Sequence, residues 1–182
     1  MNYFMPESMR FQLTVKNFKL IRMNQKINIL VVDDNKLSLH SVSNYLKGQG
    51  YELTQAANGE EALQLIESTT IDLILLDIMM PGMDGFEVCA RLKQDPATKD
   101  IPIIFLSAKI DTDDIITGFK AGGVDYITKP FNKEELLARI RNHVELKLMR
   151  DMLKSHNKQL TKSRNTFMKT LLELSKFVDS KR

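Results

Sequence analysis

Residues 27–34 read INILVVDD, an apolar run that ends in two acids. Residues 71–77 read IDLILLD and repeat this pattern with a single acid, Asp77. Continuous apolar runs of this length are typical of strands that are buried on both faces of a parallel sheet. The carboxyl ends of parallel strands lie at one edge, where open α/β sheets bind their ligands. We therefore expect Asp33, Asp34 and Asp77 to lie close together.

Two further predicted strands end in polar side chains that would reach the same edge. Residues 102–106 are followed by Ser107, and residues 124–127 are followed, after one threonine, by Lys129. Clustered carboxylates with no cation between them repel one another, so the site calls for a hard divalent cation. Carboxylate oxygens are the ligands that hard divalent cations such as Mg²⁺ prefer. The sequence therefore predicts a Mg²⁺ site beside a lysine and a serine.

Strands alternate with helices throughout the middle of the chain. The strands are expected at 27–32, 51–56, 71–76, 102–106 and 124–127, and the helices at 36–48, 59–68, 84–94, 112–121 and from 132 onward. Residues 51–56 alternate polar and apolar side chains, which indicates an edge strand. Alternation of this kind predicts an α/β fold with a doubly wound, five-stranded parallel sheet.

The motifs at the strand ends resemble those of CheY-like receiver domains of two-component response regulators. The matching stretches, in the order of the family, are VVDDN at 31–35, LLDIMMPGMDG at 75–85, LSA at 106–108 and DYITKPF at 125–131. The resemblance implies a flavodoxin-like fold with strand order 2-1-3-4-5, and a receiver domain over residues 27–147. It also implies a partner, either a histidine kinase or a phosphotransfer protein.

The resemblance assigns a role to each acid. Asp77 would be the phosphoacceptor. Asp34 and Asp77 would bind Mg²⁺ directly, Asp33 would act mostly through a coordinated water, and the main-chain carbonyl of Met79 would complete the protein ligands. The chain would then be no enzyme beyond its own Mg²⁺-dependent phosphorylation and dephosphorylation.

The resemblance also implies a switch around the lysine. Lys129 and Ser107 would contact the phosphoryl oxygens, and a cis bond between Lys129 and Pro130 would aim the lysine inward. Tyr126 would turn inward when Ser107 moves toward the phosphate, which would remodel the surface of the fourth helix, fifth strand and fifth helix. Gly122-Gly123 stands where Gly-Ala is more usual, which loosens a turn.

Simpler readings exist for each residue taken alone. Asp33 or Asp34 could cap the following helix, Lys129 could be a solvated lysine, and Tyr126 could be a plain strand tyrosine. Two other functions also fit this fold: an interaction module that works without phosphorylation, and a small hydrolase that uses Asp77. The intact set of acids, lysine and serine argues against the first, and the lack of a further catalytic acid argues against the second.

Charge and cysteine content limit the partners and the cellular compartment that the sequence suggests. The net charge is +3, yet residues 1–26 carry five Lys/Arg against one acid and residues 151–182 carry eight against three. Because these lysines are dispersed, we interpret both flanks as solvated surfaces and expect no direct nucleic-acid binding. The single cysteine, Cys89, excludes an intrachain disulfide and fits a cytoplasmic location. No apolar stretch is long enough to insert in a membrane.

The last predicted helix has no stop signal, since residues 132–182 contain neither proline nor glycine. Leu153, Leu160, Phe167 and Leu174 recur every seven residues, which is a coiled-coil period. The companion seam is weaker because it contains His156, Ser163 and Thr170. We expect residues 148–182 to form a signalling helix that makes a homodimer; a helix folded back on its own domain is the alternative.

The two ends of the chain are less informative. Residues 1–26 show no clean period, so we expect a weakly ordered extension, which could equally be a leader or a functional segment. No output domain is recognisable in the 182 residues. Either the helix itself is the output, or the chain is the N-terminal part of a larger signalling enzyme.

Overall fold

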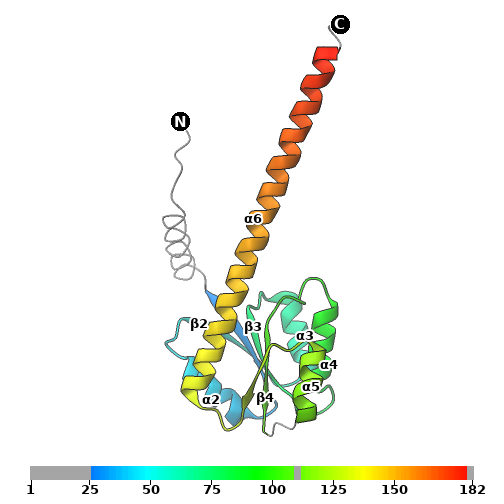
Figure 1. The fold of residues 1–182 in the computed structure, drawn as a ribbon. Coiled ribbons are helices and arrows are strands. Elements are labelled where there is room, and N and C mark those ends of the chain that lie inside the picture. Colours follow the sequence, from blue (N-terminus) through cyan, green and yellow to red (C-terminus); the bar gives the residue numbers. More distant parts are fainter. Residues whose placement is uncertain (1–25, 109–111, 180–182) are drawn as a thin grey trace.

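The computed structural model describes residues 26–108 and 112–179, and its centre is one parallel sheet (Figure 1). The strands are β1 (Ile27–Val32), β2 (Tyr51–Ala56), β3 (Leu73–Asp77), β4 (Ile103–Ser107) and β5 (Asp125–Thr128). Their order is β2-β1-β3-β4-β5. The predicted fold class, strand order and edge position of residues 51–56 are all confirmed.

Helices cover both faces of the sheet (Figure 1). They are α2 (Lys36–Leu46), α3 (Gly59–Ser68), α4 (Gly85–Gln94), α5 (Thr112–Ala121) and α6 (Lys133–Asp179). Successive strand residues point to opposite faces, which gives two buried clusters. Leu76 and Phe105 pack with α3, α4 and α5, including a fully buried Cys89. Leu75 and Ile104 pack on the other face against α2 and α6.

Several element boundaries differ from the predicted ones by one or two residues. The third strand begins at Leu73; just before it, the Asp72 N–H donates to the Asn28 carbonyl at 2.8 Å and the Asp72 carboxylate accepts the Asn28 N–H at 3.0 Å. The first helix ends at Leu46, before a turn in which Gly48 and Gly50 have φ of +77° and +81°. Such angles favour glycine and end a helix.

The helix α6 has two parts that differ in what surrounds them. Over its first turns Leu136, Ile140, Val144 and Leu148 are buried against the sheet. Beyond them the helix continues unbroken to Asp179 and projects away from the sheet (Figure 1). The prediction of one uninterrupted helix is confirmed. The boundary at 147/148 falls inside this helix and stays a prediction, while the predicted weak order of residues 1–26 lies almost wholly outside the described residues.

Candidate functional site

Strand register places the predicted site residues side by side at the carboxyl edge of the sheet. Val32 is paired with Leu76, so Asp33 and Asp77 are the next residues of adjacent strands. Asp77 is paired with Leu106, one residue before Ser107. Ser107 is paired with Thr128, one residue before Lys129. The expected gathering of these side chains is confirmed as a matter of geometry, whereas their chemical roles remain predictions.

Three carboxylates form the centre of the site. Asp33, Asp34 and Asp77 each offer an oxygen, and these oxygens all lie within 4.8 Å of one another. Asp33 is fully buried and Asp77 nearly so, while Asp34 is exposed. One side of the cluster is therefore fixed in the core and the other opens to solvent.

Lys129 is the cation nearest to the buried acids. Its Nζ lies 2.7 Å from Asp33 Oδ2 and 2.7 Å from Asp77 Oδ2, and the peptide bond to Pro130 is cis, as predicted. Asp33 Oδ2 receives no hydrogen bond of good geometry from any described residue, so its proximity to Lys129 counts as an ionic contact. Two buried carboxylates thus share one lysine, and the exposed Asp34 adds a third negative charge beside them.

Electrostatics at the site follow from this arrangement. Burial raises the pKa of Asp77 above its ordinary value; Lys129 opposes the shift, and the charge on Asp33 adds to it. Burial disfavours the ammonium of Lys129, but the two carboxylates outweigh this and raise the pKa of Lys129. The lysine therefore stays charged, while Asp77 carries a destabilised negative charge that a further cation would relieve.

The donor set fits Mg²⁺. Magnesium favours a few carboxylates and keeps several waters, so it suits a cluster with one open side. Asp33, Asp34 and Asp77 would hold the ion, and the unsatisfied Asp33 Oδ2 is the observation that supports this fit. The role expected of the Met79 carbonyl stays a prediction; the Met79 side chain is exposed beside the site.

The helix α2 is capped by its own asparagine, while Asp33 Oδ1 accepts the N–H of that residue, Asn35, at 3.0 Å. The cap of α2 is Asn35, whose Oδ1 accepts the N–H groups of Leu37 and Ser38 at 2.9 and 3.3 Å. The reading of Asp33 or Asp34 as the cap of this helix is therefore wrong. Gly85 lets α4 begin directly against β3, because a Cβ there would overlap the Asp77 carbonyl oxygen.

The two predicted switch residues lie inside the domain. Ser107 ends β4 and is buried. Tyr126 on β5 is also buried, and its hydroxyl donates to the Asp114 carbonyl of α5 at 2.8 Å. Tyr126 is thus bonded to a helix rather than being a plain strand tyrosine, although its role in signalling stays a prediction.

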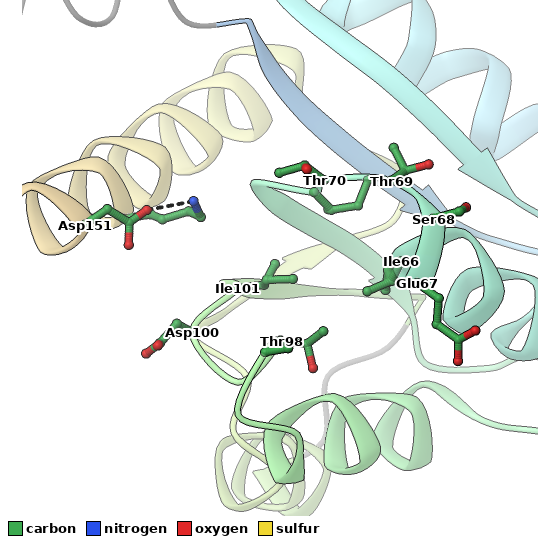
Figure 2. Close-up of a pocket in the computed structure, with 12 residues that line it drawn as sticks. Ile66, Glu67, Ser68, Thr69, Thr70, Thr98, Asp100, Ile101 and Asp151 are labelled. Atoms are coloured by element: carbon green, nitrogen blue, oxygen red, sulfur yellow. Dashed lines mark hydrogen bonds and ion pairs between the residues drawn. The ribbon is translucent and has the colours of Figure 1, made fainter. Parts of the chain in front are cut away.

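A second cluster of charges lies at the opposite, amino edge of the sheet and was missed from sequence. Lys147 lies 3.0 Å from Asp72 and 2.8 Å from Asp151, and Lys154 lies 2.5 Å from Asp100. Lys147, Asp151 and Asp100 border a hollow of about 470 Å³ between the end of α3, the loop before β4 and α6 (Figure 2). Lysines at helical spacing were the available signal, but nothing local identified their partners.

Comparison with known proteins agrees with the site. Residues 29–141 match the response regulator receiver domain family. The transcriptional regulatory protein YvrH of Bacillus subtilis is 43% identical over 122 residues, which cover 66% of this chain and 50% of YvrH. A Vibrio cholerae protein named "Probable cyclic di-GMP phosphodiesterase" is 36% identical over 166 residues, covering 87% of this chain and 37% of that protein.

A solved structure shares the fold. The signal receiver domain of an HD domain-containing protein from Pseudomonas fluorescens Pf-5 is 28% identical, with a TM-score of 0.65, and the match covers 69% of this chain and 99% of that one. The chain spans half or less of the length of the two curated relatives. No helix in the described parts of the chain is long and apolar enough to cross a membrane. The family match, the sheet order and the clustered acids agree: the chain belongs to the response regulator receiver domain family.

Proposed function

We propose that the protein is a phosphoacceptor that takes a phosphoryl group on Asp77 from a histidine kinase or a phosphotransfer protein. The observation that carries the proposal is the crowding of negative charge at the carboxyl edge: the buried Asp33 and Asp77 share Lys129, and an oxygen of the exposed Asp34 lies within 4.8 Å of theirs. A site built only for stability would balance these charges, because an unpaired buried charge is costly.

The proposed reaction uses few protein groups. A carboxylate oxygen of Asp77 attacks phosphorus, an O–P bond forms to give an acyl phosphate, and the P–N bond of the donor phosphohistidine breaks while its imidazole takes up a proton. Bound Mg²⁺ would neutralise charge on the phosphoryl oxygens. Lys129 would exchange part of its contact with Asp77 for a phosphoryl oxygen, and positioning with charge neutralisation would supply most of the catalysis.

Signal output would start at Ser107 and Tyr126. Ser107 would donate its hydroxyl to a phosphoryl oxygen, and Tyr126 would report this movement to α5, to which its hydroxyl is bonded. The surface formed by α5, β5 and α6 is the proposed relay, with α6 carrying the change onward in a cytoplasmic protein.

The chain would serve as the regulatory part of a longer signalling protein. The match to the Vibrio cholerae protein covers 87% of the chain. A match of this length must include residues of α6 beyond the part that packs on the sheet. The match to YvrH covers 66% of the chain, about the length of the receiver. This difference favours an enzymatic output, such as a cyclic-dinucleotide phosphodiesterase, over a DNA-binding one.

A second copy of the chain is the proposed partner of α6. Leu153, Leu160 and Phe167 are 64%, 56% and 63% exposed and recur every seven residues. Leu146, 56% exposed, extends the series by one heptad toward the sheet, opposite the buried face of the helix. A helix with such a stripe needs a partner. The polar seam residues would keep the pairing moderate.

Intact-mass analysis tests the phosphoacceptor. After acetyl phosphate treatment with Mg²⁺, the protein should gain one phosphoryl group, and chelation of Mg²⁺ should prevent the gain. Asp77→Asn should take up none, whereas Asp72→Asn, an acid at the opposite edge of the sheet, should behave as the wild type. Modification that persists in Asp77→Asn would refute the assignment and favour a phosphorylation-independent module.

Sedimentation of the full chain tests the dimer. Leu160→Glu should give a monomer, and its neighbour Gln159→Glu, which adds the same charge, should leave the dimer intact. Wild-type protein that stays monomeric at high concentration would reject pairing through α6.

A further inference from the structure

The ring of Tyr126 lies in a slot formed by aromatic side chains and by backbone. Its centroid is 5.2 Å from that of Phe105 and 5.5 Å from that of Phe119. Its hydroxyl reaches the first turn of α5, where the carbonyl oxygens of Asp114 and Ile115 lie at 2.8 and 3.3 Å. The ring therefore lies between β4 of the sheet and the helix α5.

The slot exists because Gly118 has no side chain. A Cβ built on Gly118 would overlap the Tyr126 hydroxyl and lie 2.7 Å from the ring carbon that bears it. The same Cβ would lie 2.9 Å from Cε2 of Phe105. Glycine is unfavourable inside a helix, and the backbone of Gly118 is not in the left-handed region. Gly118 therefore provides space for the Tyr126 ring, and its backbone conformation does not require a glycine.

Gly123 likewise leaves room for a neighbouring ring, that of Phe105. A Cβ on Gly123 would overlap Cε2 of Phe105 and lie 2.8 Å from Cδ2, although the backbone of Gly123 needs no glycine. Its N–H donates to the Gly118 carbonyl at 2.9 Å, which ties the two glycines together. The sequence alone treated Gly123 as part of a loosened turn, whereas it makes room for the ring of Phe105.

We infer that Gly118 and Gly123 are positioning residues that hold Tyr126 inward: Gly118 by leaving room for its hydroxyl, and Gly123 by seating Phe105 beneath it. A methyl group at position 118 would expel the ring toward the surface where Ile116 and Phe119 are already exposed. Neither glycine touches the acids or Lys129, so the chemistry at Asp77 should not change. The role of the two glycines in relaying a signal rests on the proposed function. Their effect on the orientation of the Tyr126 ring does not depend on it.

The decisive experiment follows the ring of Tyr126 in the full chain. Protein labelled with 3-fluorotyrosine gives one ¹⁹F signal per tyrosine, and the signal lost in Tyr126→Phe identifies that of Tyr126. In Gly118→Ala this signal should move toward the position of a solvent-exposed tyrosine. In Thr117→Ala, an exposed neighbour on the same helix, it should stay in place. An unmoved signal in Gly118→Ala would overturn the inference.

A double variant covers the case in which Gly118→Ala unfolds. Tyr126→Leu removes the ring, so Gly118→Ala should be tolerated in that background and the cooperative unfolding transition should return. Failure to restore folding there would show that Gly118 is needed for another reason, and would also overturn the inference.

Phosphorylation separates this inference from the proposed function. Gly118→Ala should take up phosphate on Asp77 to the wild-type extent, while the phosphate-induced change in the amide signals of Phe119 and Lys120 is lost. If the wild type itself takes up no phosphate, the proposed function fails. The fluorine signal recorded without phosphate would still show whether Gly118 keeps the Tyr126 ring inward. Normal amide changes in Gly118→Ala would overturn the relay role of the two glycines.

Discussion

The two edges of the sheet carry the same residue types but balance them differently. At the carboxyl edge, within the part of the chain that the structure describes, the buried Asp33 and Asp77 share one ion-pair partner, Lys129, and the exposed Asp34 lies beside them. At the amino edge, Asp72, Asp100 and Asp151 are matched by Lys147, Arg150 and Lys154. The first cluster has an excess of two negative charges, and the second has none.

The difference separates a binding site from a structural clamp. The pairs at the amino edge are balanced, and the inner one, Lys147 with Asp72, joins α6 to the start of β3. The carboxyl edge is unfinished without a cation, since Asp33 Oδ2 lacks a hydrogen bond and burial raises the pKa of Asp77. Charge balance, rather than the presence of acids, distinguishes the edge that we propose to be functional.

The largest effect on stability should come from removing Lys129, the cation that pairs with both buried acids of the carboxyl edge. Lys129→Met leaves Asp33 and Asp77 buried without their partner, and breaking a buried pair in this way costs about 3 kcal/mol. The domain should remain folded but lose that much free energy of unfolding in urea titrations without Mg²⁺. Lys154→Met, which breaks an exposed pair, is the control. Equal losses from the two variants would remove the distinction between the edges.

Magnesium should stabilise the chain through the carboxyl edge alone. Mg²⁺ at ten times its dissociation constant should raise the free energy of unfolding by about 1.4 kcal/mol. Asp34→Asn removes an open ligand and should abolish most of this gain, whereas Asp72→Asn should keep it. Retention of the full gain in Asp34→Asn would place the ion elsewhere.

Neutralising one acid at each edge should change the free energy of unfolding in opposite directions. The raised pKa of Asp77 means that its contribution to stability is complete below the ordinary value of 3.8 and is lost as the pH rises through the higher folded value. Asp77→Asn should therefore stabilise the Mg²⁺-free protein at neutral pH, with the advantage vanishing below pH 3.8.

The acid at the other edge shows the reverse behaviour. The hydrogen bond from Lys154 lowers the pKa of Asp100, so this group contributes stability above 3.8 that is lost as the pH falls through the lower folded value. Asp100→Asn should destabilise slightly at neutral pH and not in acid. Urea titrations of both variants at neutral and acidic pH check the signs, and the same sign for both would contradict the comparison.

Sequence predicted the carboxyl edge well because each of its side chains stands at the end of a strand or within two residues of it. Strand register then places Asp33, Asp77, Ser107 and Lys129 together with no further information. The amino edge could not be predicted in this way, since Lys147 meets Asp72 across 75 residues. That meeting depends on where α6 lies along the sheet, which no local pattern encodes.

The aromatic slot was missed for a related reason. A glycine in a helix or turn suggests backbone freedom, yet Gly118 and Gly123 are defined by the rings of Tyr126 and Phe105 that approach them. Which ring meets which glycine is a property of packing between layers. The heptad of α6 was visible in sequence, but its extension to Leu146 required knowing which face of the helix is buried.

The smallest effect should come from the outermost pair of the amino edge. Lys154 and Asp100 lie 2.5 Å apart, but their side chains are 53% and 41% exposed. Solvent and salt screen such a pair, so Lys154→Met should cost less than about 0.5 kcal/mol and the cost should shrink as salt is added. Lys147→Met should cost more, because Lys147 and Asp72 are each only 16% exposed and pair across the helix–sheet contact. Urea titrations at low and high salt would rank the two variants. If Lys154→Met matched Lys147→Met at both salt concentrations, the clamp would be one cooperative network reaching as far as Lys154, rather than an inner pair with a weak outer contact.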